Sequence, residues 1–179
     1  LFDENLVDNF KQRNGAIVLT LSPARPFIDI DPEKVGYSEI AKINSQIIYD
    51  RMLGSYKLCK KHNITVGLGT DAGSTLSPHY NFYKELILFS SWCNEDNNYS
   101  LHTATLTNAS IIGLDDKIGS VEEGKIADLL IVENDPILNL ENLGKPYMIF
   151  ANGKLIKKPH VKKDKKIDEL LGYVNYTNK

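Results

Sequence analysis

The sequence contains little cysteine and no long apolar run. Its two cysteines, Cys59 and Cys93, lack the spacing of a metal-binding motif. Two such residues in a chain of this size are typical of free thiols in a reducing compartment, so we expect a cytoplasmic protein. No apolar run is long enough to span a bilayer and no signal peptide is visible, so we expect no membrane partner.

An excess of positive charge is also missing. The chain has 21 Lys and Arg against 23 Asp and Glu, a net charge of −2, which argues against a nucleic-acid partner. The composition, 42% hydrophobic and 25% charged, is that of an ordinary globular domain. At 179 residues the chain is too short for a complete (β/α)8 barrel, which needs about 250. Because it opens on Leu1, directly inside a helical pattern, we expect it to be part of a longer protein.

Residues 1–112 alternate between helical and strand patterns, which is typical of a parallel α/β arrangement. Apolar runs predict strands at 16–21 and 64–71, and a helix at 41–62 lies between them. The stretch 22–38, with three prolines, is predicted to be a long loop. The following apolar positions of the helix recur at helical spacing and are expected to face the core: Ile43, Ile47, Ile48, Met52, Tyr56 and Cys59.

The rest of the chain has a different character. Residues 113–157 hold short strand patterns, and the Asn152-Gly153 pair between apolar runs predicts a type I′ hairpin. Residues 158–179 are expected to form a charged, solvated tail with a weak helix at 167–173. We therefore divide the chain at residues 112 and 157.

The predicted strand 64–71 ends on a carboxylate inside a glycine-rich turn. One face of the strand carries Ile64, Val66 and Leu68, and the other carries small residues before Asp71. This pattern suits a parallel strand that packs outward on helices and holds a functional group at its C-terminal end. In α/β barrels the reactive groups lie at that end, so Asp71 is the leading candidate for catalysis.

Four segments, in a fixed order, resemble parts of a known enzyme family. They are the Gly-Thr-Asp-Ala-Gly run at 69–73 with Pro78-His79, the helix at 105–114, the Gly-Ser…Gly-Lys-Ile-Ala-Asp-Leu run within 114–130, and the Asn-Gly-Lys hairpin at 152–154. Together they are similar to the C-terminal part of a metal-dependent amidohydrolase, in the imidazolonepropionase-like and prolidase-like branch. The likeness extends over about residues 1–157.

The resemblance implies a fold, a reaction and a set of site residues. The fold is α/β: part of a (β/α)8, TIM-like barrel followed by the C-terminal strands of a small β-sandwich. The reaction is hydrolysis of a carbon–nitrogen bond in a linear or cyclic amide, with a divalent metal, zinc in most members. Asp71 matches the metal ligand and proton shuttle of the last barrel strand, and His79 matches a substrate contact.

The other ligands of the family have no match in this chain. The family uses a His-x-His pair, but the four histidines here stand singly. We therefore expect a C-terminal fragment that binds no metal of its own and is inactive alone. Two alternatives stay open: a non-catalytic module that has no metal centre, and one half of a split enzyme.

Two further expectations concern partners. The complete enzyme would act on a small amide, and unpaired sheet edges predict a homo-oligomer or a complementing N-terminal half. Arg25, between two prolines, is either a contact for a substrate carboxylate or a plain surface residue.

Overall fold

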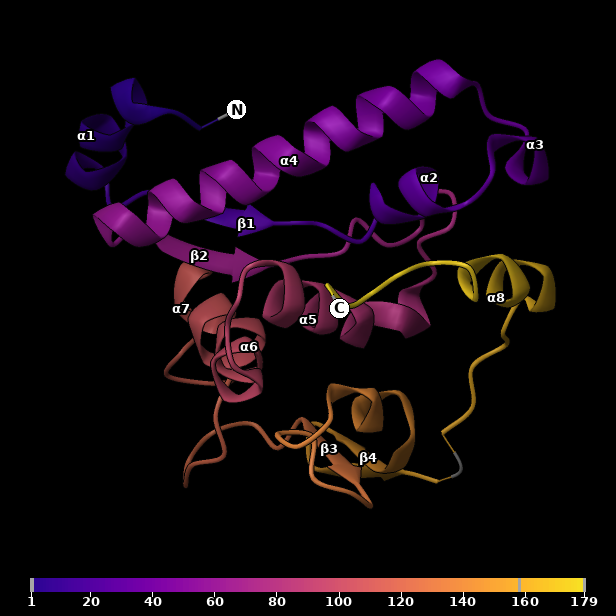
Figure 1. Ribbon diagram of the computed structural model, residues 1–179. Helices are drawn as coiled ribbons and strands as arrows, with labels where there is room; N and C mark the ends of the chain where they lie inside the picture. The colour runs from indigo at the N-terminus through magenta and orange to yellow at the C-terminus, as the bar shows by residue number, and fades with distance from the viewer. Residues whose placement is uncertain (1, 158, 179) are drawn as a thin grey trace.

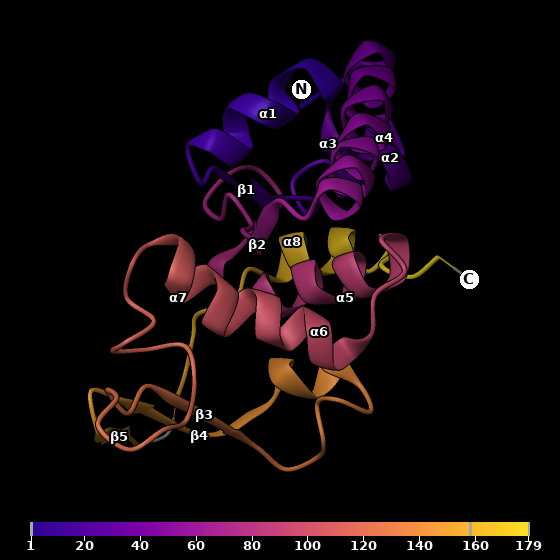
Figure 2. The same cartoon turned by 90° about the vertical axis from the view of Figure 1, so that its left-hand side faces the viewer.

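The computed structural model describes residues 2–157 and 159–178. A two-stranded parallel sheet lies between a layer of helices above and another below, and a three-stranded antiparallel sheet lies apart from it (Figures 1 and 2). The mixed α/β class is confirmed. Within the described residues the strands do not close into a barrel.

The parallel sheet pairs β1 (Ala16–Leu19) with β2 (Thr65–Leu68). Both strands are shorter than predicted, and β2 ends before the glycine-rich turn rather than at the carboxylate. The two faces differ as the pattern indicates. Leu19, Val66 and Leu68 are buried against the helices, whereas Val18 and Thr65 on the opposite face are exposed.

The long helix α4 (Glu39–His62) connects the two strands. Ser38 caps its first turn by accepting from the Ala41 amide, and Asn63 ends it in the left-handed conformation with φ of 55°. Its existence and C-terminal boundary are as the sequence predicts.

The apolar stripe expected on α4 is only partly buried. Tyr56 and Cys59 lie in the core, but Ile43, Ile47 and Ile48 are 57%, 43% and 49% exposed. Their expected burial was wrong because α4 has 24 residues whereas each strand has four, and no described part of the chain covers this side of the helix.

The proline-rich stretch 22–38 is not one loop. It contains α2 (Arg25–Asp29) and α3 (Pro32–Val35). Each helix has a proline in its first turn, where the missing N–H costs nothing because that group has no helical partner. Prolines that predict a loop here therefore start helices instead.

Six further helical segments flank the parallel sheet, and the first of them lies above it, beside α4 (Figure 2). They are α1 (Glu4–Gln12), η1 (His79–Asn81), α5 (Phe82–Trp92), α6 (Asn97–His102), the π-helical turn η2 (Thr103–Thr107) and α7 (Asn108–Ile111). Buried side chains of α5, among them Leu86, Leu88 and Phe89, join the core beneath the parallel sheet.

The second sheet has the order β3 (Leu129–Val132), β4 (Pro146–Ala151), β5 (Lys154–Ile156), with η3 (Leu140–Gly144) before β4. Asn152 and Gly153 have φ of 49° and 73°, so the predicted type I′ hairpin is confirmed.

The C-terminal residues hold α8 (Lys165–Leu171), which begins two residues before the predicted helix. The expectation of a solvated tail was wrong for its later part, since Leu171 and Val174 are buried. None of the helices that the structure describes is both long and apolar enough to cross a membrane.

Candidate active site

Asp71 lies in the loop that follows β2, at the C-terminal edge of the parallel sheet. Its side chain is exposed and its backbone is left-handed, with φ of 48°. His79 comes back to the same turn: its Cε1 atom lies 3.2 Å from where a Cβ on Gly73 would sit. The structure therefore brings the two predicted site residues to one exposed loop.

Hydrogen bonds inside the loop define its shape. The Gly73 amide donates to the Ser77 carbonyl (2.9 Å), and the Ser77 amide donates to the Ser74 carbonyl (3.1 Å). The Ser77 hydroxyl donates to the Thr70 carbonyl (3.0 Å), which ties the loop to the end of β2. Asp71 thus stands on a folded turn rather than on an open chain.

This loop alone does not make a metal centre. A hydrolytic zinc site needs about three protein ligands. Residues 2–157 and 159–178 contain no cluster of three His, Cys, Asp or Glu that could hold an ion. His62 Nε2 lies 2.9 Å from Glu4 Oε2 and His102 contacts Thr107, so neither histidine turns toward Asp71.

A buried carboxylate that sequence reasoning missed supports the adjoining strand. Glu85 of α5 is fully buried, and its two oxygens accept from the Leu21 and Ser22 amides at 2.7 Å each. Burial raises the pKa of Glu85 to about 7, although the two backbone hydrogen bonds oppose the rise. Glu85 therefore fixes the chain beyond β1 to α5. Its only signal in the sequence is a carboxylate directly before four apolar residues, Leu86 to Phe89.

A second missed residue, Asn108, closes the outer edge of β2. Its Oδ1 accepts from the Leu68 amide (2.9 Å) and its Nδ2 donates to the Leu68 carbonyl (2.8 Å), as a neighbouring strand would. The π-helical turn η2 lies immediately before it. Gly67 makes the approach possible, because a Cβ there would lie 2.3 Å from Asn108 Oδ1. The glycine inside the strand was the available signal.

We expect Asn108→Ala to lower the free energy of unfolding by about 2 kcal/mol, because both polar groups of Leu68 lose their partner. Urea denaturation measures the loss, and hydrogen exchange at the Leu68 amide should accelerate. Ser110→Ala, at an exposed position of the same helix, is the matched control. Equal stability of the two variants would contradict this role.

Arg25 is neither a substrate contact nor a surface residue. It is 6% exposed, and its guanidinium makes a two-bond ion pair with Asp29 at 2.7 Å. It also lies 4.2 Å from the centre of the Trp92 ring. Both expectations were wrong because α2 turns the side chain inward, where an i,i+4 carboxylate and an aromatic ring compensate its burial.

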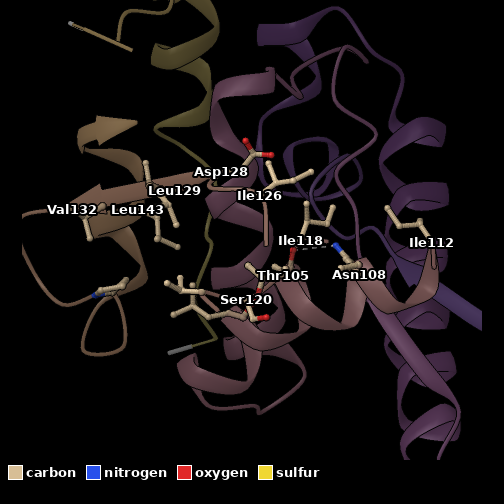
Figure 3. Close-up of a pocket in the computed structure, with 17 residues that line it drawn as sticks. Thr105, Asn108, Ile112, Ile118, Ser120, Ile126, Asp128, Leu129, Val132 and Leu143 are labelled. Carbon is tan, nitrogen blue, oxygen red and sulfur yellow. Dashed lines mark hydrogen bonds between the residues drawn. The ribbon is translucent and has the colours of Figure 1, made fainter. Parts of the chain in front are cut away.

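The structure also contains an apolar groove of about 540 Å³ between α6–α7 and β3 (Figure 3). Ile118, Ile126 and Leu129 line it, whereas Asp71 and His79 do not. Asp128 at its rim accepts from the Asn152 amide (2.6 Å) and so fastens the hairpin. The groove is therefore separate from the candidate active site.

Comparison with known proteins gives consistent matches. The sequence model of the amidohydrolase family matches residues 41–156. The crystal structure of a putative prolidase from Bifidobacterium longum is 31% identical, with a TM-score of 0.88 over 96% of this chain and 44% of that chain. No curated protein matches this chain.

Two more distant structures share the fold. One is a Xaa-Pro dipeptidase with bound methionine, 24% identical, with a TM-score of 0.67 over 87% of this chain and 37% of that one. The other is the A. niger ochratoxinase, 22% identical, with a TM-score of 0.67 over 86% and 34%. The chain thus spans less than half the length of the proteins that it matches.

Proposed function

The chain belongs to the amidohydrolase family, and we propose that it contributes Asp71 to the centre of a hydrolase that cleaves the carbon–nitrogen bond of an amide. One observation carries the proposal. In a chain that superimposes over 96% of its length on a structure 31% identical, a free carboxylate stands at the C-terminal edge of a parallel strand pair. Enzymes built on α/β barrels place their reactive groups at this edge.

The finer architecture follows from the same proposal. We assign β1 and β2 to a (β/α)8 barrel, within a barrel segment at 1–112, and the antiparallel sheet to a small β-sandwich at 113–157. The parallel pairing of β1 and β2 around α4 supports the first assignment, and the β3–β4–β5 order supports the second.

In the proposed reaction, Asp71 acts as the proton-transfer group. Its carboxylate takes a proton from water as the water oxygen bonds to the amide carbon, and returns it to the nitrogen as the C–N bond breaks. His79, on the same loop, contacts the substrate. The described residues do not by themselves fit the divalent metal, zinc, that the resemblance implies, because Asp71 is a single carboxylate. The other ligands of such a metal would come from outside this chain. The proton transfers proposed for Asp71 do not depend on them.

The test is a fusion that supplies the rest of the fold. The N-terminal part of the putative prolidase is joined to this chain, and amine release is followed with an Xaa-Pro dipeptide and an N-acyl amino acid. We expect hydrolysis by the fusion and none by the isolated chain. A folded fusion that cleaves neither amide would contradict the proposed reaction. Turnover by the isolated chain with its own tightly bound ion would contradict the incomplete centre.

A second candidate function, a module that associates with another polypeptide, has its own support. Ile40 and Ile43 on α4 are 69% and 57% exposed, and β1 has only β2 as a partner in the described chain. An exposed apolar helix face and an open strand edge each favour association.

We therefore expect the isolated chain to be a dimer or larger. Light scattering coupled to size-exclusion chromatography measures the mass, and Ile43→Lys should shift it toward the monomer. Val121→Lys replaces an exposed valine away from α4 and should leave the mass unchanged. If the parent chain stays monomeric at high concentration, the proposal that it is an association module is contradicted.

We place the protein in the cytoplasm because its cysteines are unpaired. Cys59 and Cys93 carry free thiols. Burial raises the pKa of Cys93 to about 12, so this thiol stays protonated and unreactive at neutral pH.

A further inference from the structure

The C-terminal residues pack against the loop that carries Asp71 and His79. We propose that residues 164–178, which we call the C-terminal latch, position this loop, with Leu171 and Asp168 as the positioning residues. This inference rests on the proposed function of Asp71. The latch lies beyond residues 41–156, the range that matches the family.

The first contact of the latch is apolar. Leu76, in the middle of the loop, is 5% exposed and packs in a cluster with Ile30, Leu171 and Val174. Its backbone is left-handed, with φ of 61°, a conformation that strains a leucine. Such strain persists only where the surroundings hold the residue in place. Leu171 and Val174 of the latch are two of the three buried residues that pack with Leu76.

The second contact is polar and lies at the end of the loop. Tyr80, which directly follows His79, donates its hydroxyl proton to Asp168 Oδ1 (2.9 Å). The Asp164 amide donates to the same hydroxyl oxygen (3.3 Å), and the Asp164 carboxylate caps the first turn of α8. The latch therefore holds the loop at its middle and at its end, on either side of His79.

The latch is itself fastened to the body of the protein. The Asn175 amide donates to Asp29 Oδ2 (2.8 Å), and Arg25 Nε donates to the same oxygen (2.7 Å). Further along, the Asn178 amide donates to Ser91 Oγ (2.5 Å) on α5. The segment after α8 runs across the face of α5 (Figure 1). A latch anchored to α2 and α5 can transmit their rigidity to the Asp71 loop.

Hydrogen exchange measured by NMR tests the latch without any need for activity. In Leu171→Ala and in Tyr80→Phe, the amides of Gly73 and Ser77, which are hydrogen-bonded within the loop, should exchange about tenfold faster or more. The amides of Tyr56 and Cys59, in the buried part of α4, report global unfolding and should keep their rates.

The matched controls are Glu169→Ala, at an exposed position of α8, and Tyr173→Phe, which removes a hydroxyl from an exposed tyrosine. Both should leave the loop amides unchanged. Loop exchange that stays at the parent rate in both latch variants, or that rises only in step with the Tyr56 and Cys59 amides, would overturn the proposal.

The same variants in the fusion separate this inference from the proposed function. Tyr80→Phe removes the hydrogen bond to Asp168 that positions the loop, so it should lower kcat or raise KM. Tyr173→Phe should change neither. A parent fusion without hydrolysis would end the proposed function, yet the exchange rates would still decide whether the latch holds the loop.

Discussion

Glu85→Ala is expected to lower the free energy of unfolding by about 3 to 5 kcal/mol. The substitution leaves the buried Leu21 amide and the half-buried Ser22 amide without an acceptor, which costs about 1–3 kcal/mol for each, and it opens a cavity. Urea denaturation followed by circular dichroism measures the loss. Glu123→Ala, at an exposed turn position, is the control and should change stability by about 0.5 kcal/mol or less.

Glu85 should also make stability depend on pH. Its pKa rises from an ordinary 4.5 to about 7 on folding, because burial disfavours the charged form. Between these values the folded state binds more protons than the unfolded state, so stability falls as the pH rises from 4.5 to 7. The loss is on the order of 3 kcal/mol, from 1.36 kcal/mol per pKa unit.

The isosteric variant Glu85→Gln isolates this effect, because its amide does not titrate. The difference in unfolding free energy between parent and Gln variant should therefore change between pH 5 and pH 7.5, with the parent losing more. A difference that stays constant, or that grows in favour of the parent at higher pH, would contradict the assignment of a raised pKa.

Asp71→Asn should reduce kcat/KM of the fusion by about a thousandfold, because a positioned acid–base group contributes 10²–10⁴. Asparagine is the suitable replacement, since it tolerates the left-handed φ of 48° that alanine would strain. The side chain is exposed, so the melting temperature should stay close to that of the parent.

Initial rates with the Xaa-Pro dipeptide measure the effect. Asp116→Asn replaces an exposed aspartate in a turn outside the loop and should retain full activity. If Asp71→Asn retains more than about a tenth of the parent rate, Asp71 is not the proton-transfer group.

Features that depend on a few neighbouring residues were predictable. Asn63 ends α4 and Asn152-Gly153 closes the hairpin because both conformations are set by local backbone sterics. The same applies to the alternation in β2, whose apolar face is buried. The loop position of Asp71 followed from the glycines around it, although β2 ends earlier than expected.

Features that depend on distant partners were not predictable in the same way. The exposure of Ile43 on α4 depends on what lies opposite the helix, and the inward turn of Arg25 depends on Asp29 and Trp92. The pairing of Asn108 with Leu68 joins residues 40 positions apart, and only the glycine in the strand hinted at it. Periodicity shows that a side of a helix is apolar, not whether another element covers it.

The sequence by itself determined the family, the α/β class, the hairpin and the candidate carboxylate, because motifs and short-range backbone preferences encode them. Only the tertiary structure decided the long-range contacts around that carboxylate: a buried glutamate bonded to the chain after β1, an asparagine at the edge of β2, and a C-terminal helix against Leu76. These contacts join segments 40 to about 95 residues apart, and their energy comes from desolvation and packing that exist only once the chain has folded.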